Sequence, residues 1–228
     1  NLGFAQATNL PDISVIGNFI GSNSDEDGSS FDVQEIEFSF QHYLYPGVKT
    51  NVFAALHKDD DGEREFELEE AFVDFASITE IFAGENSGLP SVGAVVGKKF
   101  LSIGKVNQLH PEQMDFVDRP MATQYLVGGG ESLAGEGAQA SYLLPTQFFS
   151  QLEFGLWTAD VHAEEEEEEH GYVEYENWMY TARSWNSFEI SDTSELELGL
   201  SYLIANASAE DDDDKKTLAA VDITYQNE

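Results

Sequence analysis

The chain has 228 residues, with 44 acidic against 10 basic side chains, a formal net charge of −34 and no cysteine. This length favours one domain, and 28 aromatic residues (16 Phe, 9 Tyr and 3 Trp) can bury more apolar surface than a disordered acidic chain carries. The charge argues against nucleic acid, itself a polyanion, as a partner, and the lack of cysteine excludes disulfides, Cys-zinc sites and thiol nucleophiles.

Apolar residues recur at every second position along most of the chain, which is typical of β-strands with one apolar face. Ile36 and Phe38 alternate with Glu35 and Glu37, and the same alternation is clear between residues 194 and 208. Helical spacing is nowhere sustained. Strands are predicted over residues 12–22, 33–45, 48–58, 65–78, 91–103, 137–144, 148–161, 176–190, 194–208 and 216–226.

The connections between these strands alternate in character. Those after even-numbered strands include compact turns such as Pro46-Gly47, whereas acidic runs follow the odd-numbered ones. In an up-and-down sheet, the loops after odd-numbered strands emerge at one end, so the sequence predicts an acidic rim. Short turns at one end and long loops at the other are typical of bacterial outer-membrane barrels. The acidic runs are residues 25–27, 59–61, 164–169 and 211–214.

Four stretches of the sequence resemble a family of porin-like outer-membrane proteins of Gram-negative bacteria, related to the phosphate-selective porin group. They are PDISVIGNF (Pro11–Phe19), GKKFLSIGKVNQLHPEQMDFVDRP (Gly97–Pro120), SWNSFEISDTSELELGLSYL (Ser184–Leu203) and LAAVDITY (Leu218–Tyr225). The resemblance implies that Gly97–Pro120 leads from a barrel strand into a loop that narrows the pore. Related barrels are usually longer and commonly finish in an aromatic residue, so we expect an incomplete barrel in this chain.

The predicted fold is therefore all-β, an antiparallel up-and-down transmembrane β-barrel of about ten strands, in a single domain over residues 1–228. Residues 104–136 lack a strand pattern, and loops of that length are usually functional. We expect this segment to fold into the lumen and set its narrowest point, with His110-Pro111 shaping the entry. By the resemblance, the pore residues include Lys98, Lys99 and Lys105, with Asp115, Asp118 and Arg119 on the loop.

Polar residues on the predicted non-lipid face should line the lumen. They are Glu35, Glu37, Arg183, Glu195 and Glu197. A metal-gathering loop is suggested by His162, Glu164, Glu169 and His170, because divalent cations take carboxylate and imidazole ligands. A solvated acidic loop is the alternative reading, since six adjacent acids repel one another. No cofactor is expected beyond loosely bound divalent cations.

These features predict a passive channel for small solutes or ions in the bacterial outer membrane, in contact with lipid and with an acidic outer vestibule. No catalytic motif is present, so an enzyme is not expected. The sequence leaves open a homo-oligomer or an enclosed partner protein. It also leaves open a soluble secreted acidic β-sandwich or barrel that binds divalent cations, because alternation does not say which face of a strand is wet.

Overall fold

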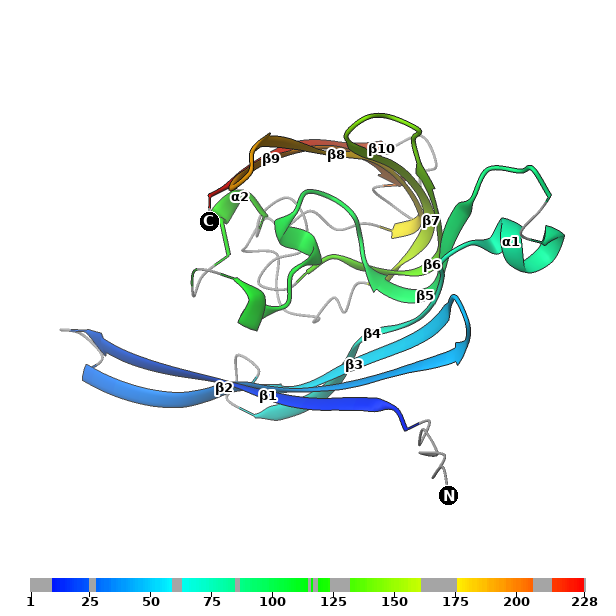
Figure 1. The fold of residues 1–228 in the computed structure, drawn as a ribbon. Coiled ribbons are helices and arrows are strands. Elements are labelled where there is room, and N and C mark those ends of the chain that lie inside the picture. Colours follow the sequence, from blue (N-terminus) through cyan, green and yellow to red (C-terminus); the bar gives the residue numbers. More distant parts are fainter. Residues whose placement is uncertain are drawn as a thin grey trace, which may run out of the picture.

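A computed structural model describes residues 10–24, 28–58, 63–84, 87–114, 116, 119–123, 132–160, 176–206 and 215–227. Ten strands form one antiparallel sheet in which each strand pairs with its neighbours in sequence (Figure 1). The strands are β1 (Asp12–Ser24), β2 (Gly28–Tyr45), β3 (Val48–Lys58), β4 (Arg64–Phe75), β5 (Val92–Phe100), β6 (Ala134–Leu143), β7 (Phe149–Asp160), β8 (Glu176–Ser191), β9 (Ser194–Asn206) and β10 (Lys215–Asn227). The prediction of an all-β, antiparallel up-and-down arrangement is confirmed.

The connection after β1 is shorter than the sequence suggested. β2 begins at Gly28 rather than near residue 33, and Gly28 pairs with Ser24. Polar side chains extend the ladder beyond the apolar alternation, because the Ser22 and Ser30 hydroxyl groups lie 2.7 Å apart and Ser29 donates a hydrogen bond to Asn23. The prediction of a long connection was therefore wrong after β1, whereas the connection from Lys58 of β3 to Arg64 of β4 is within one residue of the predicted one.

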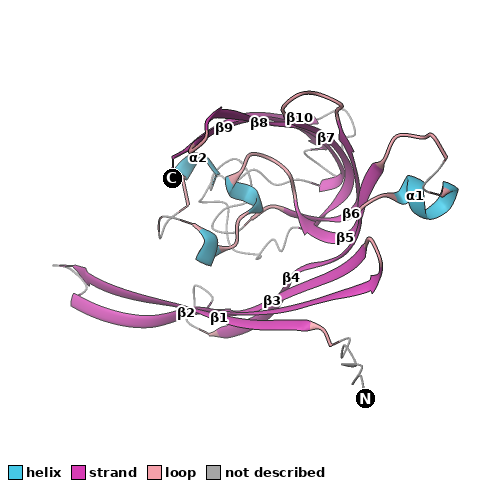
Figure 2. Cartoon of the chain, in the orientation of Figure 1, coloured by secondary structure: helices cyan, strands magenta, loops and turns pink. Residues whose placement is uncertain are grey.

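In the residues that the structure describes, four short helices lie between the strands (Figure 2): α1 (Ile78–Ala83), η1 (Val106–Gln108), η2 (Pro111–Gln113) and α2 (Met121–Thr123). The sequence pattern did not reveal α1, which is only six residues long. Local capping explains it, because the Ser77 hydroxyl accepts a hydrogen bond from the Glu80 N–H and Gly84 ends the helix with a φ of 84°. In the described parts of the chain, no helix has the length and apolar character needed to cross a membrane.

The sheet is strongly curved but open. β1 and β10 are its two edges and do not pair with each other over the described residues, so the expected barrel is not closed. Figure 1 shows β5–β10 curling around the segment between β5 and β6, while β1–β4 extend beneath it.

The seam between β4 and β5 is the shortest ladder of the sheet. It pairs residues 71–75 with residues 94–98, five pairs in all. Gly97 has a φ of 136°, and a Cβ atom placed there would lie 2.2 Å from the Ala71 carbonyl oxygen. Glycine is therefore required where the two strands part.

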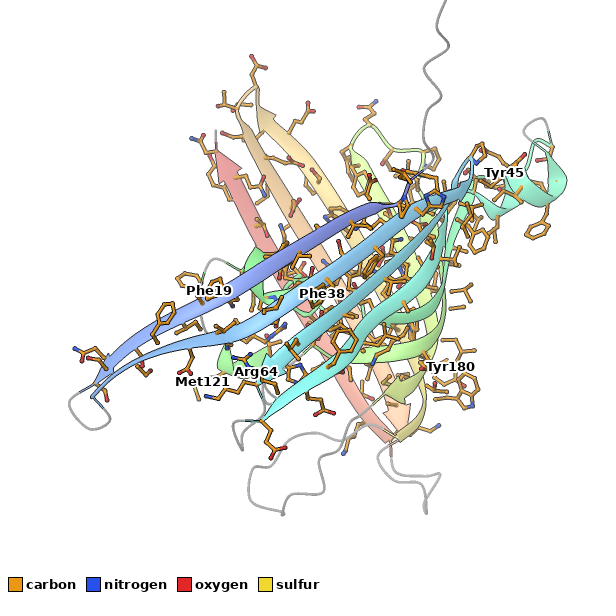
Figure 3. All side chains as sticks on the ribbon, turned by 90° about the horizontal axis from the view of Figure 1, so that it is seen from below. Phe19, Phe38, Tyr45, Arg64, Met121 and Tyr180 are labelled. Carbon is orange, nitrogen blue, oxygen red and sulfur yellow. The ribbon has the colours of Figure 1, made fainter. Side chains whose placement is uncertain are left out.

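The polarity of the two sheet faces is the reverse of that in a water-soluble sheet. Among the described residues, the buried set holds 16 polar or charged side chains and 11 hydrophobic ones, whereas 31 large hydrophobic side chains are exposed. Figure 3 labels three of the outward aromatic residues, Phe19, Phe38 and Tyr180. Outside a small apolar core, the concave face is thus mainly polar, and the convex face is mainly apolar.

A small apolar core lies on the concave side, where the segment between β5 and β6 leaves and rejoins the sheet. Leu101, Ile103 and Leu133 of that segment pack with Trp157 of β7 and Leu203 of β9.

The fully buried Asn107 closes the base of the same segment. Its amide donates to the carbonyl groups of Leu101 and Leu133 at 2.8 and 3.0 Å, and its Oδ1 accepts from the Leu133 N–H at 2.7 Å. The segment is therefore anchored at both ends on the inner wall.

Candidate functional site

The segment after β5 crosses the concave side and contacts two distant parts of the sheet. On one side, Lys105 donates to Glu197 of β9 and to Thr224 of β10. The N–H of Gly104 donates to the Ser201 hydroxyl at 3.1 Å. These contacts attach the start of the segment to the wall formed by β9 and β10.

The same wall holds a partly buried ion pair. Arg183 of β8 donates two hydrogen bonds to Asp222 of β10, at 2.8 and 3.1 Å, and a third to Ser201 at 2.7 Å. Glu195 accepts a hydrogen bond from Ser187 and shares the face of Glu197, two residues further along β9. The predicted lumen residues of β8 and β9 therefore lie on the concave face.

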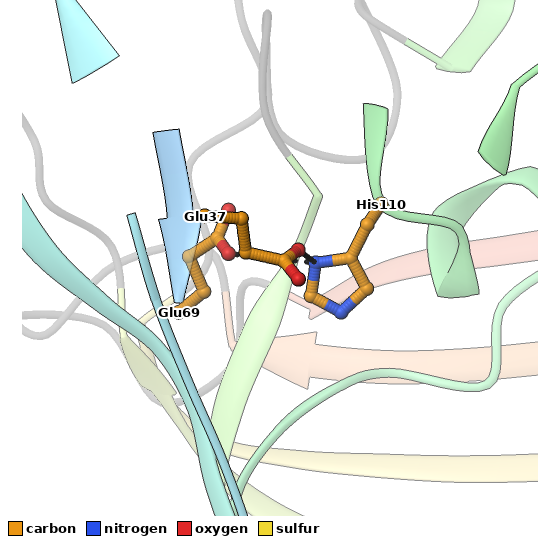
Figure 4. Close-up of side chains that lie close together, drawn as sticks. All are labelled: Glu37, Glu69 and His110. Atoms are coloured by element: carbon orange, nitrogen blue, oxygen red, sulfur yellow. Dashed lines mark ion pairs between the residues drawn. The ribbon is translucent and has the colours of Figure 1, made fainter. Parts of the chain in front are cut away.

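On the opposite side, His110 enters a group of three glutamates, two of which, Glu37 and Glu69, are drawn in Figure 4. Its Nδ1 lies 2.9 Å from Glu37 Oε2 of β2 and 3.4 Å from Glu69 Oε2 of β4. Its Nε2 forms a hydrogen bond of 3.0 Å with Glu70 Oε2. His110 and Glu37 are almost completely buried, with 4% and 3% of their surfaces exposed.

A β-bulge explains how two consecutive residues of β4 reach the same imidazole. Phe53 pairs with Glu70 and Ala54 pairs with Leu68, so Glu69 has no partner in the β3–β4 ladder. In a regular strand, Glu69 and Glu70 would point to opposite faces. The extra residue turns both carboxylates toward His110.

The orientation of the His110 ring is fixed from several directions. The Phe53 and Phe100 rings lie at centroid distances of 4.9 Å from it. Glu70, which accepts from Nε2, also accepts from the Phe100 N–H at 2.8 Å through its other oxygen. The ring therefore presents Nδ1 to Glu37 and Glu69.

Three atoms at the centre of this group lack hydrogen bonds although they are buried: His110 Nδ1, Glu37 Oε2 and Glu69 Oε2. The approach of Nδ1 to Glu37 is close but does not have the geometry of a hydrogen bond. The three atoms lie within 4.8 Å of one another and could hold a cation. A second group with that spacing consists of Glu35, Glu37 and Glu112.

The glutamates around His110 favour a positive charge at the centre of the group. Burial alone would lower the pKa of His110, but Glu37, Glu69 and Glu70 raise it, and the net shift is strongly upward. Burial raises the pKa of Glu112; its backbone hydrogen bond lowers it, and the neighbouring Glu37 raises it. Three carboxyl groups thus surround one buried imidazole.

The predicted basic pore residues do not form one cluster. Lys98 lies 3.7 Å from Glu67, Lys99 lies over the Phe72 ring, and Lys105 contacts Glu197. Arg119 donates to the carbonyl groups of Val106 and Leu109 within its own segment. Lys98 and Lys105 each pair with a carboxylate, and they do not share an anion site.

Several predicted site residues fall outside the described part of the chain. They include Asp115 and Asp118 of the loop, the proposed metal group of His162, Glu164, Glu169 and His170, and the four acidic runs. The strand ends that flank those runs, at β1, β3, β7 and β9, lie at the same end of the sheet because successive strands are antiparallel.

Sequence reasoning identified His110 and Glu37 but missed Glu69, Glu70 and Glu112. A signal for the first two was present, since the apolar phase of β4 changes from Phe66 and Leu68 to Ala71 and Val73 across the two glutamates. Such a change of parity indicates a bulge. Glu112 gave no signal, because its position depends on how the segment folds over the sheet.

Comparisons with family models, with curated proteins and with solved structures find no match for this chain. Two features of the molecule itself bear on its function: the reversed polarity of the sheet, and the segment held across its concave face.

Proposed function

We propose that this chain forms the wall of a porin-like β-barrel in a bacterial outer membrane and acts as a passive channel for small solutes or ions. The observation that carries the proposal is the reversed polarity of the sheet. Exposed outward residues include Val15, Phe154, Leu200 and Val221, with exposed fractions of 56–70%. Such a face is stable in hydrocarbon, because removing each large apolar side chain from water contributes about 1.5–3 kcal/mol of favourable free energy.

The soluble alternative predicts the opposite arrangement. A secreted sandwich or barrel would turn its apolar face inward and its glutamates toward water. Glu37, Lys98 and Arg183 are instead buried, at 3%, 9% and 6% exposure. Their burial against polar partners is typical of a polar lumen wall.

The two sheet edges place a condition on this proposal. Unpaired backbone groups at an open edge are not tolerated in hydrocarbon. We therefore propose that in the membrane β1 and β10 are paired, either with each other or with strands from outside this chain. Ten is an even number of strands, so β1 and β10 run antiparallel and can form such a ladder.

The segment between β5 and β6 is the proposed constriction. It is held to β9 and β10 through Lys105 and to β2 and β4 through His110, so it spans the concave side from wall to wall. We further propose that the acidic runs form a vestibule that enriches cations and repels anions, within about 10 Å at 0.1 M salt.

Membrane fractionation and single-channel recording test the proposal. The chain should stay with the outer-membrane fraction, require detergent for solubility and conduct ions in planar bilayers. Deletion of residues 108–126 should increase the conductance, whereas the matched control, deletion of residues 164–169, should reduce cation preference with little change in conductance. A protein that stays soluble without detergent would contradict the channel, and unchanged conductance in the first deletion would contradict the constriction.

A further inference from the structure

We propose that His110, Glu37 and Glu69 bind one divalent transition-metal cation, which ties the segment after β5 to β2 and β4. The proposal is independent of the channel function, because it depends only on the side chains around His110. It also differs from the metal group predicted around His162 and His170, which lies elsewhere in the sequence.

The hydrogen bond on the far side of the ring is the first argument. Metal-binding histidines usually donate their second ring N–H to a carboxylate, which fixes the tautomer and the ring orientation. Here Nε2 pairs with Glu70, and Glu70 is itself held by the Phe100 N–H. With the proton on Nε2, Nδ1 carries a lone pair on the side of the ring that is near Glu37 and Glu69.

The three atoms that meet at Nδ1 provide the second argument. An imidazole lone pair and two carboxylate oxygens repel one another unless a positive charge lies between them. All three atoms are buried and lack hydrogen bonds, and Glu37 and His110 are each more than nine-tenths buried. Buried polar atoms in that state are rare in folded proteins. A cation would satisfy all three.

The spacing agrees with coordination. Ligand atoms about 2.1 Å from a metal lie about 3.0 Å apart at right angles and about 3.4 Å apart at the tetrahedral angle. Nδ1 lies 2.9 Å from Glu37 Oε2 and 3.4 Å from Glu69 Oε2. Both distances match those between ligands of one metal ion, and the three atoms lie within 4.8 Å of one another.

The donor set selects the class of cation. One imidazole nitrogen with carboxylate oxygens suits Zn²⁺, Co²⁺ or Mn²⁺, whereas Ca²⁺ prefers six to eight oxygen atoms. Glu35 and Glu112, grouped around Glu37, place two further carboxyl groups next to the site. A proton on Nδ1 is the competing explanation, and it would supply one positive charge without metal.

Cobalt titration of the full chain in detergent micelles tests the site, because Co²⁺ bound to nitrogen and oxygen ligands gives visible absorption bands. Residues 162–170 could bind the same ion, so all proteins carry His162→Ala and His170→Ala. We expect one equivalent of Co²⁺ with bands that Zn²⁺ removes and Ca²⁺ does not. Glu69→Gln should weaken binding more than about 100-fold, and Glu70→Gln, beyond the ligand shell, about 10–100-fold. His57→Ala is the matched control on the same sheet and should not change binding.

Circular dichroism identifies any variant that fails to fold. His110→Ala should abolish the bands; if it misfolds, Glu69→Gln decides, because its side chain keeps its size and has no ladder partner to lose. Absence of Co²⁺ binding in the folded background protein would overturn the proposal in favour of a protonated imidazole. Equal binding in Glu69→Gln and the background protein would overturn it as well. Conductance is not measured, so failure of this site is distinguishable from failure of the channel.

Discussion

Replacing Leu200 with arginine discriminates directly between a convex face in lipid and one in water. Leu200 is the seventh of thirteen residues in β9, pairs with Val221 of β10, and has 56% of its surface exposed. A strand needs about 9–11 residues to cross a bilayer, so the centre of β9 would lie near the midplane.

The expected cost differs strongly between the two environments. Arginine at the midplane on the lipid face of a barrel costs about 2–4 kcal/mol. That cost corresponds to a folding equilibrium constant lowered by about 30-fold to 900-fold. On a surface exposed to water, the same substitution would change stability by only about 0.5 kcal/mol in either direction.

The assay is reversible guanidinium unfolding in phospholipid vesicles, followed by the fluorescence of the three tryptophans. Ile190→Arg is the matched control, because Ile190 is 60% exposed but lies at the end of β8 beside the Asp192-Thr193 turn. Near the interface it should cost about 0–1 kcal/mol. Equal effects of the two substitutions, each below about 0.5 kcal/mol, would refute a lipid-facing convex surface.

Three further predictions concern the sheet. If β1 closes on β10, chains that combine Val15→Cys with a cysteine at one outward position of β10 (Ala219, Val221, Ile223 or Tyr225) should include one that forms an intramolecular cross-link in membranes, seen as a monomer of altered mobility. Dimers alone would instead indicate pairing between copies, and the chain has no cysteine of its own. Gly97→Ala should lower the free energy of unfolding by about 2 kcal/mol, because the added Cβ meets a carbonyl oxygen at a positive φ; an unchanged denaturation midpoint would contradict strain at the β4–β5 seam. Arg183→Met should lower the free energy of unfolding by about 3 kcal/mol, because it leaves Asp222 without its cation. Adding Asp222→Leu should recover part of that loss, and no recovery in the double variant would argue against coupling of the pair.

The strands could be predicted from the sequence because alternation is a local property. The bounds of β3 agree with residues 48–58, and β7, β8 and β9 differ by two residues or fewer at each end. The start of β2 was missed because Ser29 and Ser30 pair through hydroxyl groups rather than apolar side chains. Helix α1 was missed because a six-residue helix depends on its cap at Ser77 rather than on periodicity.

The candidate site could be predicted only in part. His110 and Glu37 were identified separately, one by its position in the long segment and the other by strand parity. Their proximity depends on the path of the segment across the sheet, which no local pattern encodes. Glu69 and Glu70 depend in addition on the bulge in β4. Local patterns thus predicted the sheet, whereas the site depends on contacts between residues distant in sequence.

The consecutive strand order has a consequence for folding kinetics. Every ladder of the sheet joins neighbours in sequence, so the sheet can grow hairpin by hairpin at a low cost in loop entropy. The contacts of the segment after β5 are of another kind, because Lys105 and Thr224 are 119 positions apart. Those contacts require β10 and the sheet curvature to be in place already. Docking of this segment should therefore be a late step, and a spectroscopic label on it would report the end of folding rather than its beginning.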